Sequence, residues 1–155
     1  MSTVDAIQIG GSHYKGTTYQ HWDFALRALQ GRYLEGNITK YLARHRSKNG
    51  LQDLQKARHY LSKLMQECRS GTVTSMVSSP LYIGLSRFQS AEHFCDVNGV
   101  NEKEREVIIK LSRWSCLADL GGCALLLDEL ISEHEAREEQ AAEVTSHYVN
   151  QDWER

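Results

Sequence analysis

Residues 36–65 read GNITKYLARHRSKNGLQDLQKARHYLSKLM, and this stretch decides the fold. In and beside this stretch, mainly apolar side chains recur at helical spacing on both sides of Lys48-Asn49-Gly50. They are Leu34, Ile38, Leu42 and His45 before this break, and Leu51, Leu54, Leu61, Leu64, Met65 and Cys68 after it. Asn and Gly tolerate left-handed backbone, so the break is typical of a tight turn. Because a short turn makes successive helices antiparallel neighbours, the stretch predicts a helical hairpin.

The opposite face of the predicted hairpin is polar and basic. Its members recur at three- and four-residue steps, which place side chains on one side of a helix. They are Asn37, Lys40, Tyr41, Arg44 and Lys48 on the first helix, and Asp53, Lys56, Ala57 and Tyr60 on the second. Residues 40–69 contain eight Lys or Arg against two acids, a net charge of +6 within a chain of net charge −2. The face therefore predicts a cleft that meets an anionic ligand or an acidic neighbour.

A wider set of positions resembles a small phage-encoded family. They are Ser12-His13-Tyr14, Gly36-Asn37, Lys40-Tyr41, Arg44, Lys48, Asp53-Leu54, Lys56-Ala57 and Tyr60. Members of that family are usually described as nucleotide kinases or left without a function, and the better-described ones phosphorylate deoxynucleoside monophosphates without a Walker P-loop. The resemblance covers Ser12 to about Met65. It implies a phage protein of the host cytoplasm that transfers a phosphate from ATP to a deoxynucleoside monophosphate, with Mg²⁺ as a cofactor.

The basic face has the residue types that phosphoryl transfer requires, because that reaction depends on cations positioned around phosphates. Lys40 and Arg44 are the candidate catalytic cations: Arg forks onto two phosphate oxygens, and Lys acts as a movable charge. Asp53 is the only carboxylate on this face, so it is the candidate for binding Mg²⁺ or for polarising the acceptor phosphate. The alternative is that Asp53 pairs with Lys56 or caps the second helix. The further candidates for nucleotide or phosphate binding are His13, Tyr14, Lys15, Asn37, Tyr41, Lys48, Lys56 and Tyr60.

Three of these candidates come from residues 10–16, which read GGSHYKG. This glycine-bracketed loop is not a P-loop, because its order is Lys-Gly rather than Gly-Lys followed by Ser or Thr. In the functional interpretation, its backbone amides, His13 and Lys15 approach a phosphate. In the alternative interpretation, it is an N-terminal turn whose His13 caps a helix.

The remaining sequence indicates an all-α fold of antiparallel helical hairpins in a small bundle, with an irregular N-terminal loop. A helix is expected at Tyr19–Leu29. Residues 1–70 are expected to form the motif-bearing domain, 71–79 a Ser- and Thr-rich linker, and 80–155 a helical C-terminal region.

Three helices are expected in the C-terminal region. The first starts at Ser79-Pro80 and stops at Asn98-Gly99, and Asn101 caps the second. The second helix runs from Glu102 to about Gly121, with a buried stripe formed by Val107, Ile108, Leu111, Trp114 and Leu117/Ala118. Gly121-Gly122 is expected to break or kink it, and the third helix runs from there to about Ala142. The acidic tail from Glu133 to Arg155 is expected to fray.

Composition predicts a soluble cytoplasmic protein. Hydrophobic residues make up 41% of the chain and charged residues 25%, which is ordinary for globular proteins. The four cysteines show no CxxC pair, so reduced thiols are expected and zinc is not. The first ten residues lack the pattern of a signal peptide. The most apolar run, Cys116–Ile131, contains three acids and does not fit a membrane span.

Charge is distributed unevenly along the chain. Residues 101–155 carry 13 acids and 6 bases, in contrast to the basic hairpin. Such opposite blocks can dock within one chain or between subunits, and together with the apolar stripes they predict a homo-oligomer. The alternative is a solvated acidic helix face.

Two other classes of function remain open. A helical nucleotide pyrophosphohydrolase needs clustered acids for Mg²⁺, and the acids at 102–106 and 128–135 lack the tight paired spacing. A non-catalytic protein would sequester a nucleotide or bind a host factor through the basic face. Nucleic acid is a less expected partner, because the net charge is negative and the bases are confined to one hairpin.

Overall fold

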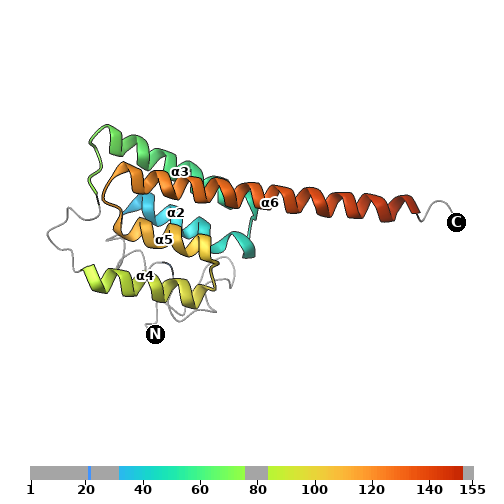
Figure 1. Cartoon of the computed structure of the whole chain (residues 1–155), viewed down its shortest axis with the longest axis horizontal. Helices are drawn as coiled ribbons and strands as arrows, with labels where there is room; N and C mark the ends of the chain where they lie inside the picture. Colours follow the sequence, from blue (N-terminus) through green and yellow to red (C-terminus); the bar gives the residue numbers. More distant parts are fainter. Residues whose placement is uncertain (1–20, 22–31, 76–83, 152–155) are drawn as a thin grey trace, which may run out of the picture.

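The computed structural model describes His21, residues 32–75 and residues 84–151, with side chains described up to residue 75 and from 89 to 145. Within these ranges the regular structure is entirely helical, which confirms the predicted all-α bundle (Figure 1). The segments are α2 (Tyr33–Arg44), the short 3₁₀ helix η1 (His45–Ser47), α3 (Leu51–Arg69), α4 (Gly84–Asn98), α5 (Glu102–Arg113) and α6 (Leu117–Gln151). The predicted 19–29 helix, the 10–16 loop and the helix start at Ser79-Pro80 lie outside the described residues.

The hairpin predicted from residues 36–65 is present, with α2 and α3 side by side. Its turn is closed by the backbone N–H of Gly50, which donates to the carbonyl oxygen of His45 at 2.9 Å. Gly50 has φ +50°, a backbone conformation that favours glycine. The turn thus lies where the Asn-Gly pair predicted it.

Replacing Gly50 by Ala is expected to lower the free energy of unfolding by about 1–3 kcal/mol, because a residue with a Cβ is strained at this φ. The added Cβ would also lie 3.1 Å from Nε2 of His134. Urea unfolding measures the loss. Gly99→Ala is the matched control, because Gly99 has φ +58° but nothing within 4 Å of its Cβ position. An equal loss in both variants would show that the His134 contact adds nothing.

One hydrophobic core draws side chains from both halves of the chain. Its largest fully buried members are Trp114, Phe94, Ile38, Leu42, Leu54, Leu61, Leu64, Ile108 and Leu111. The predicted stripes of α2 and α3 therefore face inward, with Leu34, Leu51, Met65 and Cys68 only partly buried. The indole N–H of Trp114 donates to Glu35 Oε1 at 3.1 Å and so ties α5 to α2.

The predicted end of the second C-terminal helix was wrong. α5 ends at Arg113, the chain is extended at Trp114, and α6 starts at Leu117. The restart is stabilised by Asp119, whose Oδ2 accepts from the backbone N–H groups of Ser115 and Cys116 at 2.8 and 3.2 Å. These contacts satisfy donors that a new helix would otherwise leave free.

Two details of the predicted stripe and break also differ. Gly121-Gly122 lies inside α6 and does not interrupt it, since helix propensity is a weak preference that tertiary packing overrides. Leu117 is half-buried and Ala118 is exposed, because both belong to the new helix rather than to the buried stripe of α5.

The acidic tail was expected to fray from Glu133, and the helix was expected to end near Ala142. Instead α6 is continuous to Gln151. Residues 133–143 are rich in Glu, Ala, Arg and Gln, which have high helix propensity. Two predicted boundaries are confirmed: α4 ends at Asn98, and Asn101 caps α5 through a capping box with Glu104.

Cys68, Cys95, Cys116 and Cys123 are free thiols in the structure. Burial raises the pKa of the Cys95 and Cys123 thiols to about 12, so both remain protonated. Across the described ranges, no helix combines the length and apolar character needed to traverse a bilayer.

Candidate anion-binding face

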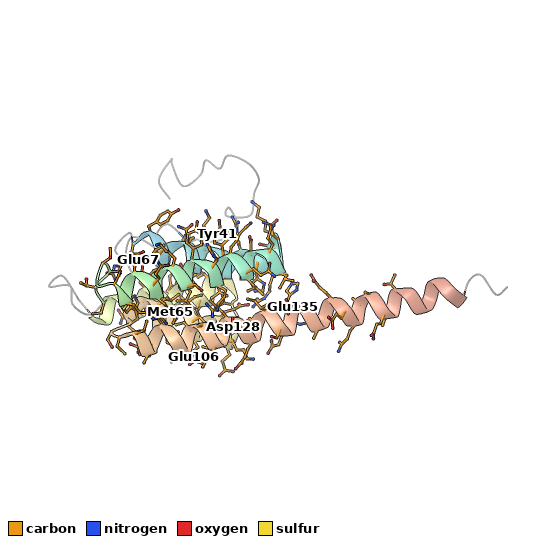
Figure 2. The ribbon with its side chains drawn as sticks, turned by 90° about the horizontal axis from the view of Figure 1, so that it is seen from above. Tyr41, Met65, Glu67, Glu106, Asp128 and Glu135 are labelled. Carbon is orange, nitrogen blue, oxygen red and sulfur yellow. The ribbon has the colours of Figure 1, made fainter. Side chains whose placement is uncertain are left out.

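Tyr41 lies at the centre of the polar side of the α2–α3 hairpin. Lys40 Nζ, Arg44 Cζ and Lys56 Nζ lie 5.7, 4.7 and 5.6 Å from the centroid of its ring. Tyr60 of α3 stacks on Tyr41, with centroids 5.7 Å apart and planes at 21°. Figure 2 shows Tyr41 on the outer side of the hairpin, away from α6. We call these five residues the Tyr41 face.

The sequence spacing explains why the Tyr41 face forms. The rows that contain Ile38 and Leu54 turn into the core, so the adjacent rows of both helices remain outside. Lys40 and Arg44 are four residues apart on α2, and Lys56 and Tyr60 are four apart on α3, so each pair shares one side of its helix. The tight turn then brings the two rows together, as predicted.

Asp53 is the fully buried counter-ion beneath this face. Arg44 donates to it twice, from Nε to Oδ2 at 2.9 Å and from a terminal nitrogen to Oδ1 at 3.3 Å. Asn49 donates to Oδ1 at 3.2 Å, and Lys56 Nζ lies 3.7 Å from Oδ1. Burial opposes ionisation, but the hydrogen bonds from Arg44 and Asn49 outweigh it and hold the pKa of Asp53 below its usual range. Asp53 is therefore ionised at neutral pH, and it orients the guanidinium of Arg44.

Positive charge exceeds negative charge on the Tyr41 face. Lys56 also donates to Gln52 at 3.0 Å, which directs its ammonium along the outer side of α3. Lys40 has no carboxylate partner among the described residues, and the same holds for Lys48 at the exposed turn. Three cations and one buried carboxylate thus leave a local excess that favours an anion.

His21 lies behind this face on the core side of α2. Its Nε2 is 3.0 Å from the hydroxyl oxygen of Thr39, and its ring meets that of Phe94 edge-on at 6.0 Å. Burial, followed by the nearby charge of Lys40, lowers the pKa of His21 to about 4. The imidazole is therefore neutral at pH 7.

Acidification is expected to destabilise the protein before its carboxylates titrate. The folded pKa of His21, about 4, is below the ordinary histidine value of 6.5, so the unfolded chain binds more protons between these values. The free energy of unfolding is thus highest above pH 6.5 and falls by up to about 3 kcal/mol as the pH falls toward 4. Urea unfolding between pH 7 and 4.5 measures it. His21→Gln should flatten the dependence and His59→Gln, at an exposed position, should not; a flat wild-type curve would contradict the assignment.

The structure brings together six of the predicted site residues: Lys40, Tyr41, Arg44, Asp53, Lys56 and Tyr60. Asn37 is on the same row of α2, where its side-chain N–H donates to the carbonyl oxygen of Tyr33 at 2.8 Å. Lys48 is exposed beside the turn. His13, Tyr14 and Lys15 lie outside the described residues.

Sequence reasoning missed three contributors to this face. Tyr33 meets Tyr60 edge-on at 6.1 Å and is 69% exposed, and His59 meets Tyr60 at 6.5 Å. A hydrogen bond with Tyr33, then partial burial, raises the pKa of the Tyr60 phenol. Tyr33 precedes Asn37 and Tyr41 by four and eight residues, so the helical spacing contained the signal for it. Asn49, the third contributor, was assigned only to the turn.

Several acids of the C-terminal half make ion pairs. Asp128 pairs with Arg58 of α3 at 2.8 Å, and Lys103 pairs with Glu129 and Glu133 at 2.7 and 2.5 Å. Glu104 is buried, with His45 Nε2 at 2.7 Å and Arg46 beside it. Some basic residues of the hairpin thus pair with acids of α5 or α6 in the same chain, as the first of the two predicted docking modes requires.

The described residues do not fit a directly bound Mg²⁺ on the Tyr41 face. Both oxygens of Asp53 already accept hydrogen bonds, and the carboxylate has no exposed surface. No group of three or more His, Cys, Asp or Glu in the described part of the chain is arranged to hold a metal ion.

The family comparison covers the same region as the Tyr41 face. A family model described as a protein of unknown function, DUF3310, matches residues 2–62, which include α2 and most of α3. No curated protein and no solved structure matched the chain. The match therefore covers α2 and the part of α3 that carries the Tyr41 face.

Proposed function

We propose that the Tyr41 face binds a nucleotide. The observation that supports this proposal is the convergence of Lys40, Arg44 and Lys56 on a stacked pair of tyrosines. A nucleotide combines a polyanion with a flat aromatic base, and the face offers cations beside aromatic rings. A bare anion site would not need the tyrosines.

In this proposal the phosphates contact Lys40 and Lys56, and the guanidinium that Asp53 orients supports them. A charge-assisted hydrogen bond contributes about 1.5–3 kcal/mol. Exposed Tyr33, at the edge of Tyr60, is the surface on which the base stacks. Base–aromatic stacking contributes about 1–3 kcal/mol. Two phosphate contacts and one stacked base would then contribute about 4–9 kcal/mol before the cost of ordering, which corresponds to a Kd between about millimolar and micromolar.

A second candidate is phosphoryl transfer from ATP to a deoxynucleoside monophosphate, the activity that the sequence resemblance implies. The clustered lysines and arginine favour it, because phosphoryl transfer depends mainly on positioned cations. Asp53, however, is occupied by Arg44 and Asn49. We therefore propose binding as the primary function, and phosphoryl transfer as the activity to be tested on the same site.

Calorimetric titration of the full-length protein with ATP and with each deoxynucleoside monophosphate tests the proposal. The matched ligands are the corresponding deoxynucleoside, which lacks the phosphate, and inorganic phosphate, which lacks the base. We expect the nucleotide to bind at least tenfold more tightly than either fragment. Equal binding of inorganic phosphate would reduce the site to a simple anion site, and no binding of any nucleotide would overturn the proposal.

The same samples distinguish the two activities. Protein incubated with ATP, Mg²⁺ and a deoxynucleoside monophosphate is analysed by chromatography. New nucleoside diphosphate supports phosphoryl transfer, released pyrophosphate indicates a pyrophosphohydrolase, and binding without turnover leaves a nucleotide-sequestering protein.

A further inference from the structure

α6 continues well beyond the bundle that its first half completes. Leu130 is the last of its residues in the buried core, and the half-buried His134 meets the ring of His45 at 6.4 Å. From Glu135 to Thr145 every side chain is exposed. Both views show that no other described helix lies beside this part of α6 (Figures 1 and 2). A solvated helix of this kind is stable only with many internal charge pairs or with a partner.

One row of this exposed segment consists of unpaired acids. Glu135, Glu139 and Glu143 follow each other at four-residue steps on one side of α6. None of the three makes an ion pair with another described residue, whereas Glu133 and Glu138 pair with Arg137 and His134. Like charges four residues apart destabilise a helix. A surface that brings cations to this row would therefore stabilise it.

The hairpin carries a basic row of its own. Lys40 and Arg44 are four residues apart on α2, and Lys48 follows η1 at the exposed turn. Lys40 and Lys48 have no carboxylate partner in the described ranges, so the ends of this row can pair with acids. The acidic and basic rows are thus complementary in sign.

Only the start of the acidic row, Glu135, lies near the hairpin turn of its own chain (Figure 2). α6 is one continuous helix to Gln151, and its second half extends away from the hairpin (Figure 1). Glu139 and Glu143 pair with no cation of the described residues, so another molecule can bring cations to them. A second copy carries such cations on its hairpin.

We propose that the Glu135–Glu143 row of α6 docks onto the Lys40–Lys48 row of a second copy of this chain. The inference goes beyond the proposed function and does not depend on it. The contact is heterologous, because two different surfaces meet, so it produces either a reciprocal pair or a longer assembly. It is mainly electrostatic, so salt weakens it.

Charge reversal of each row, measured by sedimentation velocity without nucleotide, tests the proposal. The full-length wild type should associate at low salt and dissociate as salt is raised. Glu139→Lys/Glu143→Lys should be monomeric, because two basic rows then face each other, and so should Lys40→Glu/Lys48→Glu. An equimolar mixture of the two variants should associate again. The matched control is Glu102→Lys/Glu106→Lys on α5. It changes the net charge by the same amount as Glu139→Lys/Glu143→Lys and should behave like the wild type.

Several outcomes would overturn the proposal. The first is a wild type that stays monomeric at every concentration. The second is association that persists in both charge-reversal variants. The third is a mixture of the two variants that does not associate. Circular dichroism checks that each variant is folded. If Lys40→Glu/Lys48→Glu does not fold, Glu139→Lys/Glu143→Lys still tests the proposal. Calorimetry reads nucleotide binding separately, so a failure of one proposal is distinct from a failure of the other.

Discussion

Asp53→Asn is expected to lower the free energy of unfolding by about 3–5 kcal/mol, the range found when one member of a buried ion pair is removed. Asp53 has no exposed surface, and the side chain of Arg44 is only 16% exposed. An amide keeps one acceptor oxygen but turns an N–H group toward the donors of Arg44 or Asn49. The variant therefore loses the charge and also places donor against donor.

Urea unfolding of the variant against the wild type measures this loss. Asp128→Asn is the matched control, because Asp128 also accepts from an arginine, Arg58, but is 52% exposed. Exposed ion pairs contribute roughly 0–1 kcal/mol, so the control should remain near the wild type. Equal, small losses at both positions would show that the pair beneath the Tyr41 face does not stabilise the fold.

The Asp53 variant also separates two roles for this carboxylate. If Asp53 mainly orients Arg44, nucleotide affinity and stability should fall together in Asp53→Asn. If it acts on the acceptor phosphate, binding should persist in the folded variant while turnover is lost. The contacts with Arg44, Asn49 and Lys56 favour the first role. The sequence had offered only a pair with Lys56 or a helix cap as the alternative to metal or acceptor chemistry.

The hairpin and its polar face could be predicted because their information is local. The turn needs only Asn49-Gly50, and the rows of α2 and α3 follow from steps of three and four residues. Ile38 and Leu54 are buried and Lys40 and Lys56 share a face for the same reason, since one helix side is apolar and the adjacent one is not.

The structure after Arg113 could not be predicted in the same way, because tertiary contacts determine it. Trp114 is fixed by its hydrogen bond to Glu35, which lies 79 positions earlier in the chain. Asp119 then caps the new helix from within its first turn. Local propensity placed the break at Gly121-Gly122, the weakest helix formers nearby, and missed the capping carboxylate.

The burial of Asp53 could not be predicted from the sequence for a related reason. Spacing placed it on the polar row with Lys56, and helical periodicity does not report how far a row is buried where two helices meet. The packed hairpin places Asp53 beneath the cations rather than beside them. A carboxylate in that position orients the cations of the face, and it is too deeply buried to contact a ligand itself.

Lys40→Ala/Lys56→Ala is expected to weaken nucleotide binding by about 3–6 kcal/mol if the two contacts are independent, which is at least a hundredfold in Kd. Each change removes one ammonium within 5.7 Å of the Tyr41 centroid and leaves Arg44 held by Asp53. Stability should change by less than about 1 kcal/mol, because neither lysine belongs to the core. Calorimetry and urea unfolding of the same preparation measure both effects.

Lys63→Ala/Arg69→Ala is the control for this pair of substitutions. It removes the same two positive charges from the hairpin, but at exposed positions of α3 that make no described contact with the Tyr41 ring. If long-range attraction of the nucleotide dominated, both double variants would lose similar affinity, and raising the salt would abolish binding in parallel. If direct phosphate contacts dominate, only Lys40→Ala/Lys56→Ala loses affinity. Unchanged affinity and turnover in a folded Lys40→Ala/Lys56→Ala variant would instead leave the basic face as a docking surface for a macromolecule.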